Sequence, residues 1–169
     1  MQGNKIRNIV VLGHQSSGKT TWSKQWVLED TEHRVRFNND DIRNMLGKYW
    51  VPSREELVLD LKKQFIRSSM LAGYDIVIDN MNLNPKEVEF YKTYIEEHNR
   101  IMKKLDEETI LSFKDDTKYE LEFKDFFTPL QECIKRDSKR PNPIGEEVIR
   151  KTYEKYKDII EAHSESNNK

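Results

Sequence analysis

A phosphate-binding motif occupies residues 13–20, which read Gly-His-Gln-Ser-Ser-Gly-Lys-Thr. The stretch matches G-x-x-x-x-G-K-[ST] at every fixed position. Its glycines let backbone N–H groups converge on a phosphate, because no Cβ atom stands in the way. Lys19 is expected to reach the β- and γ-phosphates of a nucleoside triphosphate, and the Thr20 hydroxyl to ligate Mg²⁺. The alternative is a tight turn with an incidental lysine. The residues predicted to bind ATP here are Gly13, Ser16, Ser17, Gly18, Lys19, Thr20 and Thr21.

A second candidate is the sequence Asn-Asn-Asp-Asp-Ile-Arg at residues 38–43, which follows a predicted strand. Asp40 could accept the proton of an attacking hydroxyl group, since phosphoryl transfer needs positioning more than a strong base. Arg43, one helical turn later, could hold Asp40 in place and bind a phosphate of the acceptor. The alternative is that Asp40 or Asp41 only caps the helix that begins here.

Polar residues also follow the strand predicted at residues 74–79. Asp79 stands where a carboxylate would hold a magnesium-bound water. Asn80 and Asn82 could hydrogen-bond the acceptor. A polar strand end that binds no ligand is the alternative.

A dense basic stretch, Lys-Arg-Asp-Ser-Lys-Arg, fills residues 135–140 between two predicted helices. Such a segment could close over a triphosphate and supply arginines to the transition state. Arg136 and Arg140 are four residues apart, so we expect them on one helix face. A solvated basic loop is the alternative.

Two aromatic residues, Tyr49 and Trp50, follow Gly47 in a predicted loop. Their rings could stack on an unpaired nucleobase. Packing against the protein is the commoner role of such residues, and the sequence alone favours it.

These side chains need a scaffold that brings distant segments together. Short apolar runs alternate with helical patterns, which predicts an α/β domain with a parallel sheet. A capping box, Ser53 to Glu56, is expected to begin the third helix, with Leu57, Leu61 and Phe65 on its inner face. The predicted strands are 6–12, 35–37, 74–79 and 119–123, and the predicted helices are 20–29, 40–46, 53–73, 85–105, 129–136 and 145–161. In a parallel sheet the carboxyl ends of the strands face the ligand crevice, where the candidate residues are expected to meet.

The chain has 169 residues, of which 36% are apolar and 35% charged. This size predicts one domain, over residues 1–162, and a flexible tail at 163–169. The apolar runs are far shorter than the ~20 residues of a membrane span, and the N-terminus shows no apolar signal segment. The single cysteine, Cys133, excludes an internal disulfide framework and a cysteine-built zinc site. We expect a cytoplasmic protein in a reducing setting.

The net charge of −1 is unevenly distributed. Residues 1–50 and 131–157 each carry eight Lys/Arg against five Asp/Glu, whereas residues 51–130 carry twelve against seventeen. A surface that binds anions is therefore compatible with the near-neutral total.

The whole pattern resembles the kinase domain of bacteriophage-type polynucleotide 5′-hydroxyl kinases. The stretches that carry the likeness are GHQSSGKTTW at 13–22, NNDDIR at 38–43, IDNMNLNP at 78–85, CIKRDSKR at 133–140, and the helix with Ile149, Arg150 and Tyr153. The resemblance implies a P-loop kinase fold with a parallel four-stranded sheet in the order 2-3-1-4, flanking helices and a helical lid at about 134–145. The chain departs from the family at Met81, where a threonine is usual, and at residues 99–118, which look like an insertion. It also lacks the Asp-x-Asp-x-Thr motif of a fused phosphatase.

The resemblance also implies roles for individual residues. Asp40 matches the general base, Arg43 the acceptor-binding arginine, and Arg136 and Arg140 the lid arginines that clamp the phosphates of ATP. Together with Lys19, this makes Asp40, Arg136 and Arg140 the expected catalytic residues. The expected reaction is the ATP- and Mg²⁺-dependent phosphorylation of 5′-hydroxyl ends of DNA or RNA, with nucleic acid as the partner. Two alternatives stay open: a kinase for a small nucleoside or nucleotide, and a non-enzymatic ATP-gated interaction module that uses residues 99–118.

Overall fold

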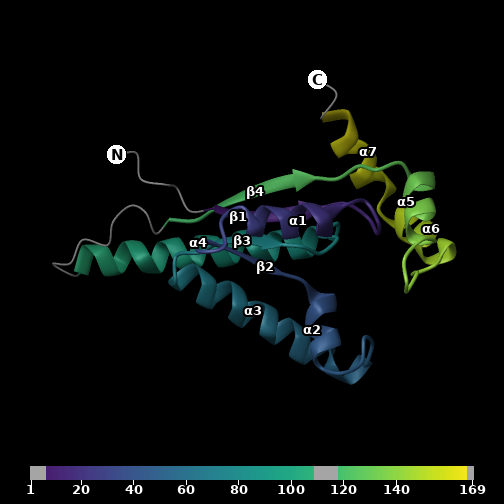
Figure 1. Cartoon of the computed structure of the whole chain (residues 1–169). Coiled ribbons are helices and arrows are strands. Elements are labelled where there is room, and N and C mark those ends of the chain that lie inside the picture. The colour runs from purple at the N-terminus through teal and green to yellow at the C-terminus, as the bar shows by residue number, and fades with distance from the viewer. Residues whose placement is uncertain (1–6, 109–117, 167–169) are drawn as a thin grey trace.

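The computed structural model describes residues 7–108 and 118–166. The elements run in the order β1 (Arg7–Leu12), α1 (Lys19–Leu28), β2 (Arg34–Phe37), α2 (Asn39–Met45), the 3₁₀ turn η1 (Pro52–Arg54), α3 (Glu55–Leu71), β3 (Asp75–Ile78), α4 (Pro85–Glu108), β4 (Glu120–Asp125), α5 (Leu130–Asp137), α6 (Glu146–Lys155) and α7 (Lys157–Ser166) (Figure 1). The four strands form one parallel sheet in the order β2-β3-β1-β4. This confirms the predicted fold class and strand order.

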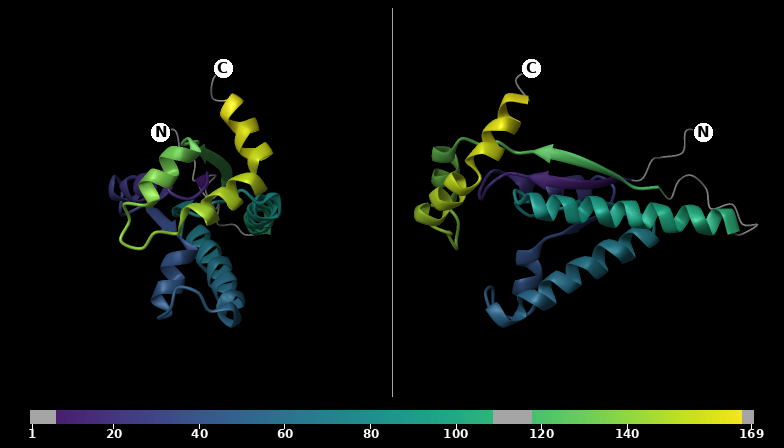
Figure 2. Two further views of the ribbon diagram at one scale, coloured as in Figure 1. Left: turned by 90° about the vertical axis from the view of Figure 1, so that its right-hand side faces the viewer. Right: turned by 180° about the vertical axis from the view of Figure 1, so that it is seen from behind.

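The two central strands are the most apolar because both of their faces are covered. In β1 and β3, Val10 and Ile76 face a core that α3 and α4 complete with Ile66 and Tyr91. Helices α1 and α4 lie on opposite sides of the sheet (Figure 2). The edge strand β4 is more polar and more exposed than β1 and β3. The phosphate-binding motif at residues 13–20, called the P-loop from here on, is therefore anchored to the best-buried strand of the sheet.

Helix α4 begins as the sequence predicts. The side chain of Asn84 accepts a hydrogen bond from the Lys86 backbone N–H at 3.1 Å, and Pro85 is the first helical residue. Residues 99–108 of the predicted insertion form the last turns of α4, and residues 109–117 lie outside the described residues.

The capping box predicted at residues 53–56 is wrong. Ser53 lies inside the 3₁₀ turn η1, and α3 begins at Glu55 without a side-chain cap. The buried face of α3 is also shifted from the predicted one, because Val58 and Ile66 pack inward while Leu57 stays 47% exposed.

The long C-terminal helix predicted at 145–161 is divided in two. Tyr156, with φ −118° and ψ 17°, ends α6, and α7 starts at the next residue. Neither Gly nor Pro stands at this position, so the sequence gives no signal for the break. Ile149 and Ile160 are buried on either side of it, as predicted. Within residues 7–108 and 118–166, no helix is long and apolar enough to cross a membrane.

Candidate active site

The P-loop connects β1 to α1 and is held from three sides. The Gly13 N–H donates to the Met81 carbonyl oxygen at 3.3 Å, and the buried His14 ring contacts the Thr128 carbonyl oxygen at 3.0 Å. Thr128 returns a hydrogen bond from its hydroxyl to the Ser17 carbonyl oxygen at 2.8 Å. Gly13 has φ 138°, and a Cβ there would lie 2.5 Å from the Phe126 carbonyl oxygen. Only glycine fits this position, because a side chain would collide with the chain that follows β4.

Lys19 opens α1 with its ammonium group folded into the loop. Its Nζ donates to the His14 carbonyl oxygen at 2.6 Å and to Ser17 Oγ at 3.3 Å. The residue is only 7% exposed. Burial lowers the pKa of Lys19 to about 8, although the nearby carboxylates, Asp79 foremost, oppose that shift.

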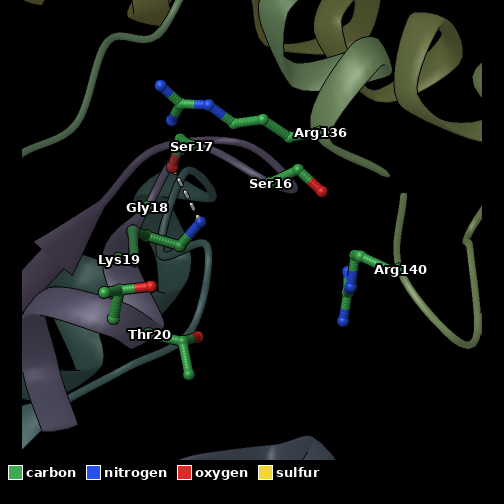
Figure 3. Close-up of a pocket in the computed structure, with 8 residues that line it drawn as sticks. Ser16, Ser17, Gly18, Lys19, Thr20, Arg136 and Arg140 are labelled. Carbon is green, nitrogen blue, oxygen red and sulfur yellow. Dashed lines mark hydrogen bonds between the residues drawn. The ribbon is translucent and has the colours of Figure 1, made fainter. Parts of the chain in front are cut away.

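A pocket of about 520 Å³ lies over the P-loop and reaches Arg136 and Arg140 (Figure 3). These two arginines belong to residues 134–145, the segment predicted to form a lid, and we keep the name lid for it. Arg136 extends over Ser17, and Arg140 lies across the open space from Lys19 and Thr20 (Figure 3). The lining residues are Ser16, Ser17, Gly18, Lys19, Thr20, Thr21, Arg136 and Arg140. Each of them belongs to the set that the sequence predicts to bind ATP. Gly13, the remaining member of that set, shapes the base of the loop.

The two lid arginines come from different parts of the backbone, contrary to the prediction that they share a helix face. Arg136 lies in the last turn of α5, whereas Arg140 follows the end of that helix in the turn leading to α6. Arg136 pairs with Glu132 at 3.0 Å, and Arg140 lies 3.5 Å from Asp137. Although paired, both side chains are about half-exposed, so each can still contact an anion in the pocket.

Asp137, inside the basic stretch, connects the lid to the P-loop. One carboxylate oxygen accepts from Ser16 Oγ at 3.3 Å and the other from the Gly145 N–H at 2.9 Å. The side chain is only 3% exposed. Burial alone would raise the pKa of Asp137, but the N–H groups of Gly145 and Ile144, together with Arg140, lower it below the usual value. Sequence reasoning missed Asp137 because charge counting treats residues 135–140 as a cationic run.

At the end of β3, Asp79 and Thr20 lie in contact. Thr20 Oγ1 donates to Asp79 Oδ1 at 3.3 Å. Arg36 of β2, which the sequence did not single out, holds the other carboxylate oxygen through Nε at 2.7 Å and Nη2 at 2.6 Å, and it also pairs with Asp41. Burial raises the pKa of Asp79, while Arg36 opposes that shift.

The donor set at Thr20 and Asp79 fits Mg²⁺. This ion takes oxygen ligands, needs only one or two carboxylates and keeps several waters and substrate phosphates around it. Because Arg36 occupies Asp79 Oδ2, Oδ1 is the oxygen left facing Thr20 and the P-loop. The described residues contain no cluster of three or more His, Cys, Asp or Glu that could hold a metal by themselves.

Helix α2 presents Asp40 without using it as a cap. The side chain of Asn38 is the N-cap and accepts from the N–H groups of Asp40 and Asp41 at 2.9 and 3.0 Å. The Asp40 carboxylate is therefore free for Arg43, whose Nη1 lies 2.6 Å from Oδ1. Arg43 is itself fixed by Glu55, which accepts from Nε at 2.9 Å and Nη2 at 2.6 Å.

A second pocket, of about 780 Å³, opens between α2 and the lid. Its lining includes Asp40 and Asn44 of α2, and Thr20 and Arg140, which also line the pocket over the P-loop. The two pockets thus meet at Thr20 and Arg140, and Asp40 lines the second of them. A donor phosphate and an acceptor group can occupy neighbouring sites there.

The two asparagines predicted to contact the acceptor both have hydrogen-bond partners within the protein. Asn80 exchanges hydrogen bonds with the backbone N–H and side chain of Asn39 at 3.0 and 3.3 Å and so holds the start of α2. Asn82 is 1% exposed; its amide nitrogen donates to the Val11 and Ile78 carbonyl oxygens and its oxygen accepts from the Tyr91 hydroxyl. This burial corrects the prediction for Asn82, which anchors β3 to β1 and faces neither pocket.

Comparison with known proteins supports this reading of the fold. The family model described as AAA domain matches residues 9–163. No curated protein matches the chain significantly. A chain of the Pnkp1/Rnl/Hen1 RNA repair complex aligns over 87% of this chain with a TM-score of 0.65 and 21% identity, and a chain of a second Pnkp1/Rnl/Hen1 complex structure aligns over 78% with 0.58 and 19%. This chain covers 42% and 39% of those chains, less than half of their length. At such identities the likeness is one of fold.

Proposed function

Since the chain belongs to the AAA domain family over residues 9–163, we propose that it is an ATP-dependent kinase that phosphorylates the 5′-hydroxyl ends of DNA or RNA. The observation that carries the proposal is the meeting of the two pockets at Thr20 and Arg140, with Asp40 facing the second pocket. A nucleoside triphosphate on the P-loop would point its γ-phosphate toward that junction. An acceptor hydroxyl beside Asp40 would stand in line to attack it.

In the proposed reaction, the acceptor oxygen forms a bond to the γ-phosphorus as the bond from that phosphorus to the β,γ-bridging oxygen breaks. Asp40 accepts the proton that the hydroxyl loses, and ADP leaves. Lys19, Arg136 and Arg140 neutralise the charge on the transferring phosphoryl oxygens. Thr20, with Asp79 acting through water, would hold Mg²⁺, which supplies further charge neutralisation at the phosphates. Arg43 orients Asp40 through the 2.6 Å contact.

Nucleic acid as the acceptor is supported by the charge around the second pocket. Besides the carboxylates of Asp40 and Asp41, its lining includes Lys24 and Arg140, where a phosphate next to the reacting nucleotide would find cationic partners. Two solved structures of similar fold belong to Pnkp1/Rnl/Hen1 complexes, one of them described as an RNA repair complex, which agrees with this acceptor class.

A small-molecule kinase is the second candidate. Its support is the size of the second pocket, because about 780 Å³ falls in the range of sites that hold one nucleoside or nucleotide. The two candidates differ in whether a chain beyond the first nucleotide improves the acceptor.

The test is phosphate transfer from labelled ATP, with Mg²⁺, to a panel containing a 5′-hydroxyl oligonucleotide, a dinucleotide and a free nucleoside. We expect transfer to the oligonucleotide and at least a ~100-fold lower rate for Asp40→Asn, since a positioned base contributes about that much. Asp60→Asn is the matched control, because Asp60 is an exposed residue of α3 that pairs with Lys63 on the surface of the helix. A preference for the free nucleoside would favour the second candidate. Binding of ATP without transfer to any acceptor would support an interaction module instead.

A further inference from the structure

We propose that Tyr49 is the stacking platform for the nucleobase of the acceptor's terminal nucleotide, an assignment that rests on the proposed function. Tyr49 lies between α2 and η1 and lines the second pocket together with Asp40. Among the residues that line this pocket in the described chain, it carries the only aromatic ring.

The ring of Tyr49 is available to a ligand. The residue is 50% exposed, although it contributes to a pocket wall. Within the described residues, neither an aromatic ring nor a cation packs on its face. Its neighbour Trp50 is 53% exposed but differs on this point, since the Arg43 guanidinium lies 5.3 Å from the centre of its ring. Trp50 also does not line the pocket.

Tyr49 lies in the same pocket as the carboxylate that is proposed to accept the proton, since both residues line it. Partial burial and the charge of Asp40 raise the pKa of Tyr49, while Arg43 and Arg140 oppose that shift. A nucleotide whose 5′-hydroxyl meets Asp40 would bring its own base over this ring.

Stacking of this kind fits an acceptor that differs in sequence from one molecule to the next. Every base has a π-face, so an aromatic platform accepts all four bases without reading their edges. The structure thus assigns to this pocket a requirement for a base at the terminal nucleotide, but not for one particular base.

The experiment compares two 5′-hydroxyl oligonucleotides that differ only in the terminal nucleotide, which is either intact or abasic. We expect the wild type to have about a tenfold lower acceptor KM for the intact end, a factor in the range for loss of one stacked base. Tyr49→Leu should lose this preference and leave the KM for ATP unchanged. Tyr49→Phe should keep it, because the ring remains. Met45→Ala is the control, since Met45 is an exposed residue of α2 that lies outside both pockets.

Equilibrium binding of the same two oligonucleotides, by fluorescence anisotropy without ATP, separates this proposal from the proposed function. Tighter binding of the intact end without phosphate transfer would leave the platform standing and overturn the kinase. Transfer at equal efficiency to intact and abasic ends would overturn the platform and leave the kinase standing. If the protein neither binds the oligonucleotides nor transfers phosphate to them, both the platform and the kinase are overturned. If Tyr49→Leu keeps the preference for the intact end, the base is bound by other residues and the assignment to Tyr49 is overturned.

Discussion

Two buried charges lie beside the P-loop: Lys19, which lines the pocket over the loop, and Asp79, which accepts a hydrogen bond from Thr20. Lys19 is 7% exposed and donates its N–H groups to the loop itself. Its reduced pKa, about 8, means that part of the lysine population becomes neutral at mildly alkaline pH. Asp79 keeps its charge partner in Arg36, whose guanidinium is bound to it through two nitrogens. The burial that positions these groups therefore also makes the charge of Lys19 sensitive to pH.

At the residue scale, we predict that ATP affinity falls as the pH rises through 8. The lysine loses its proton above that value in the free protein, whereas a bound triphosphate favours the charged form and raises its pKa. ATP binding should then take up a proton between pH 7.5 and 9.5. Titration with a fluorescent ATP analogue across this pH range measures the affinity. Calorimetry in buffers of different ionisation enthalpy measures the proton uptake. Lys19→Met should bind weakly with no pH dependence, and a flat profile in the wild type would contradict the prediction.

The lid and the P-loop are coupled through a single buried carboxylate. Asp137, at the end of α5, accepts hydrogen bonds from Ser16 in the P-loop and from the Gly145 N–H just before α6. Arg140 lies in the turn between these two attachments. The position of the lid arginine relative to the phosphates therefore depends on the hydrogen bonds of Asp137.

At the element scale, we predict that Asp137→Asn loosens the lid. In this variant an amide nitrogen, which cannot accept a hydrogen bond, replaces one of the two carboxylate oxygens of residue 137. Losing one hydrogen bond to a buried charged group should lower the free energy of unfolding by about 1–3 kcal/mol at pH 7. The native pKa of Asp137 is lowered, so this contribution is present above the ordinary carboxyl pKa and disappears as the pH falls through the native one. Urea unfolding measures the stability, and hydrogen exchange over residues 138–145 measures the loosening.

The same variant should raise the KM for ATP, since Arg140 would be held less firmly. Glu147→Gln is the matched control, because Glu147 forms an exposed ion pair with Lys151 on α6 that contributes little. Unchanged hydrogen exchange in the turn, together with an unchanged KM, would show that the lid is positioned by other contacts.

Most elements could be predicted because each has a local signal. The apolar run of β1, the proline after Asn84 and the P-loop spacing all act within a few residues. The break at Tyr156 and the 3₁₀ turn before α3 could not be predicted, because tertiary packing determines both. At the break itself the sequence has neither Gly nor Pro. The P-loop could be recognised from the spacing of its residues, whereas the roles of Arg36 and Asp137 could not, because each acts through a partner more than forty residues away. Asn82 shows the converse, a polar residue whose buried partners only the fold reveals.

Across the whole molecule, positive charge is concentrated where the two pockets meet. The basic segments 1–50 and 131–157 supply Lys19, Lys24, Arg36 and Arg140, while the acidic segment 51–130 supplies the long helices α3 and α4. A net charge of −1 therefore coexists with a local cationic surface.

At this scale we predict a weak salt dependence for acceptor binding. A pocket that grips only the end of a strand neutralises about two or three phosphates, so log Kd against log salt concentration should have a slope of about 2 or less. The slope should be the same for a short and a long single-stranded 5′-hydroxyl oligonucleotide. Anisotropy titrations between 50 and 300 mM salt measure it. A slope of about 4 or more, which corresponds to some six phosphate contacts, would place the strand along an extended surface instead.

The hydrogen bonds that surround the P-loop also set an order of events during synthesis. His14, Gln15 and Ser16 have partners 114, 137 and 121 residues later in the chain. At a translation rate of about 5–20 residues per second, these partners leave the ribosome some 5 to 30 seconds after the loop. The P-loop is thus made well before the segments that hold it in its folded shape. Nascent chains stay unable to hold a triphosphate in that shape until α6 has emerged, and long-range closure of this kind slows the final folding step.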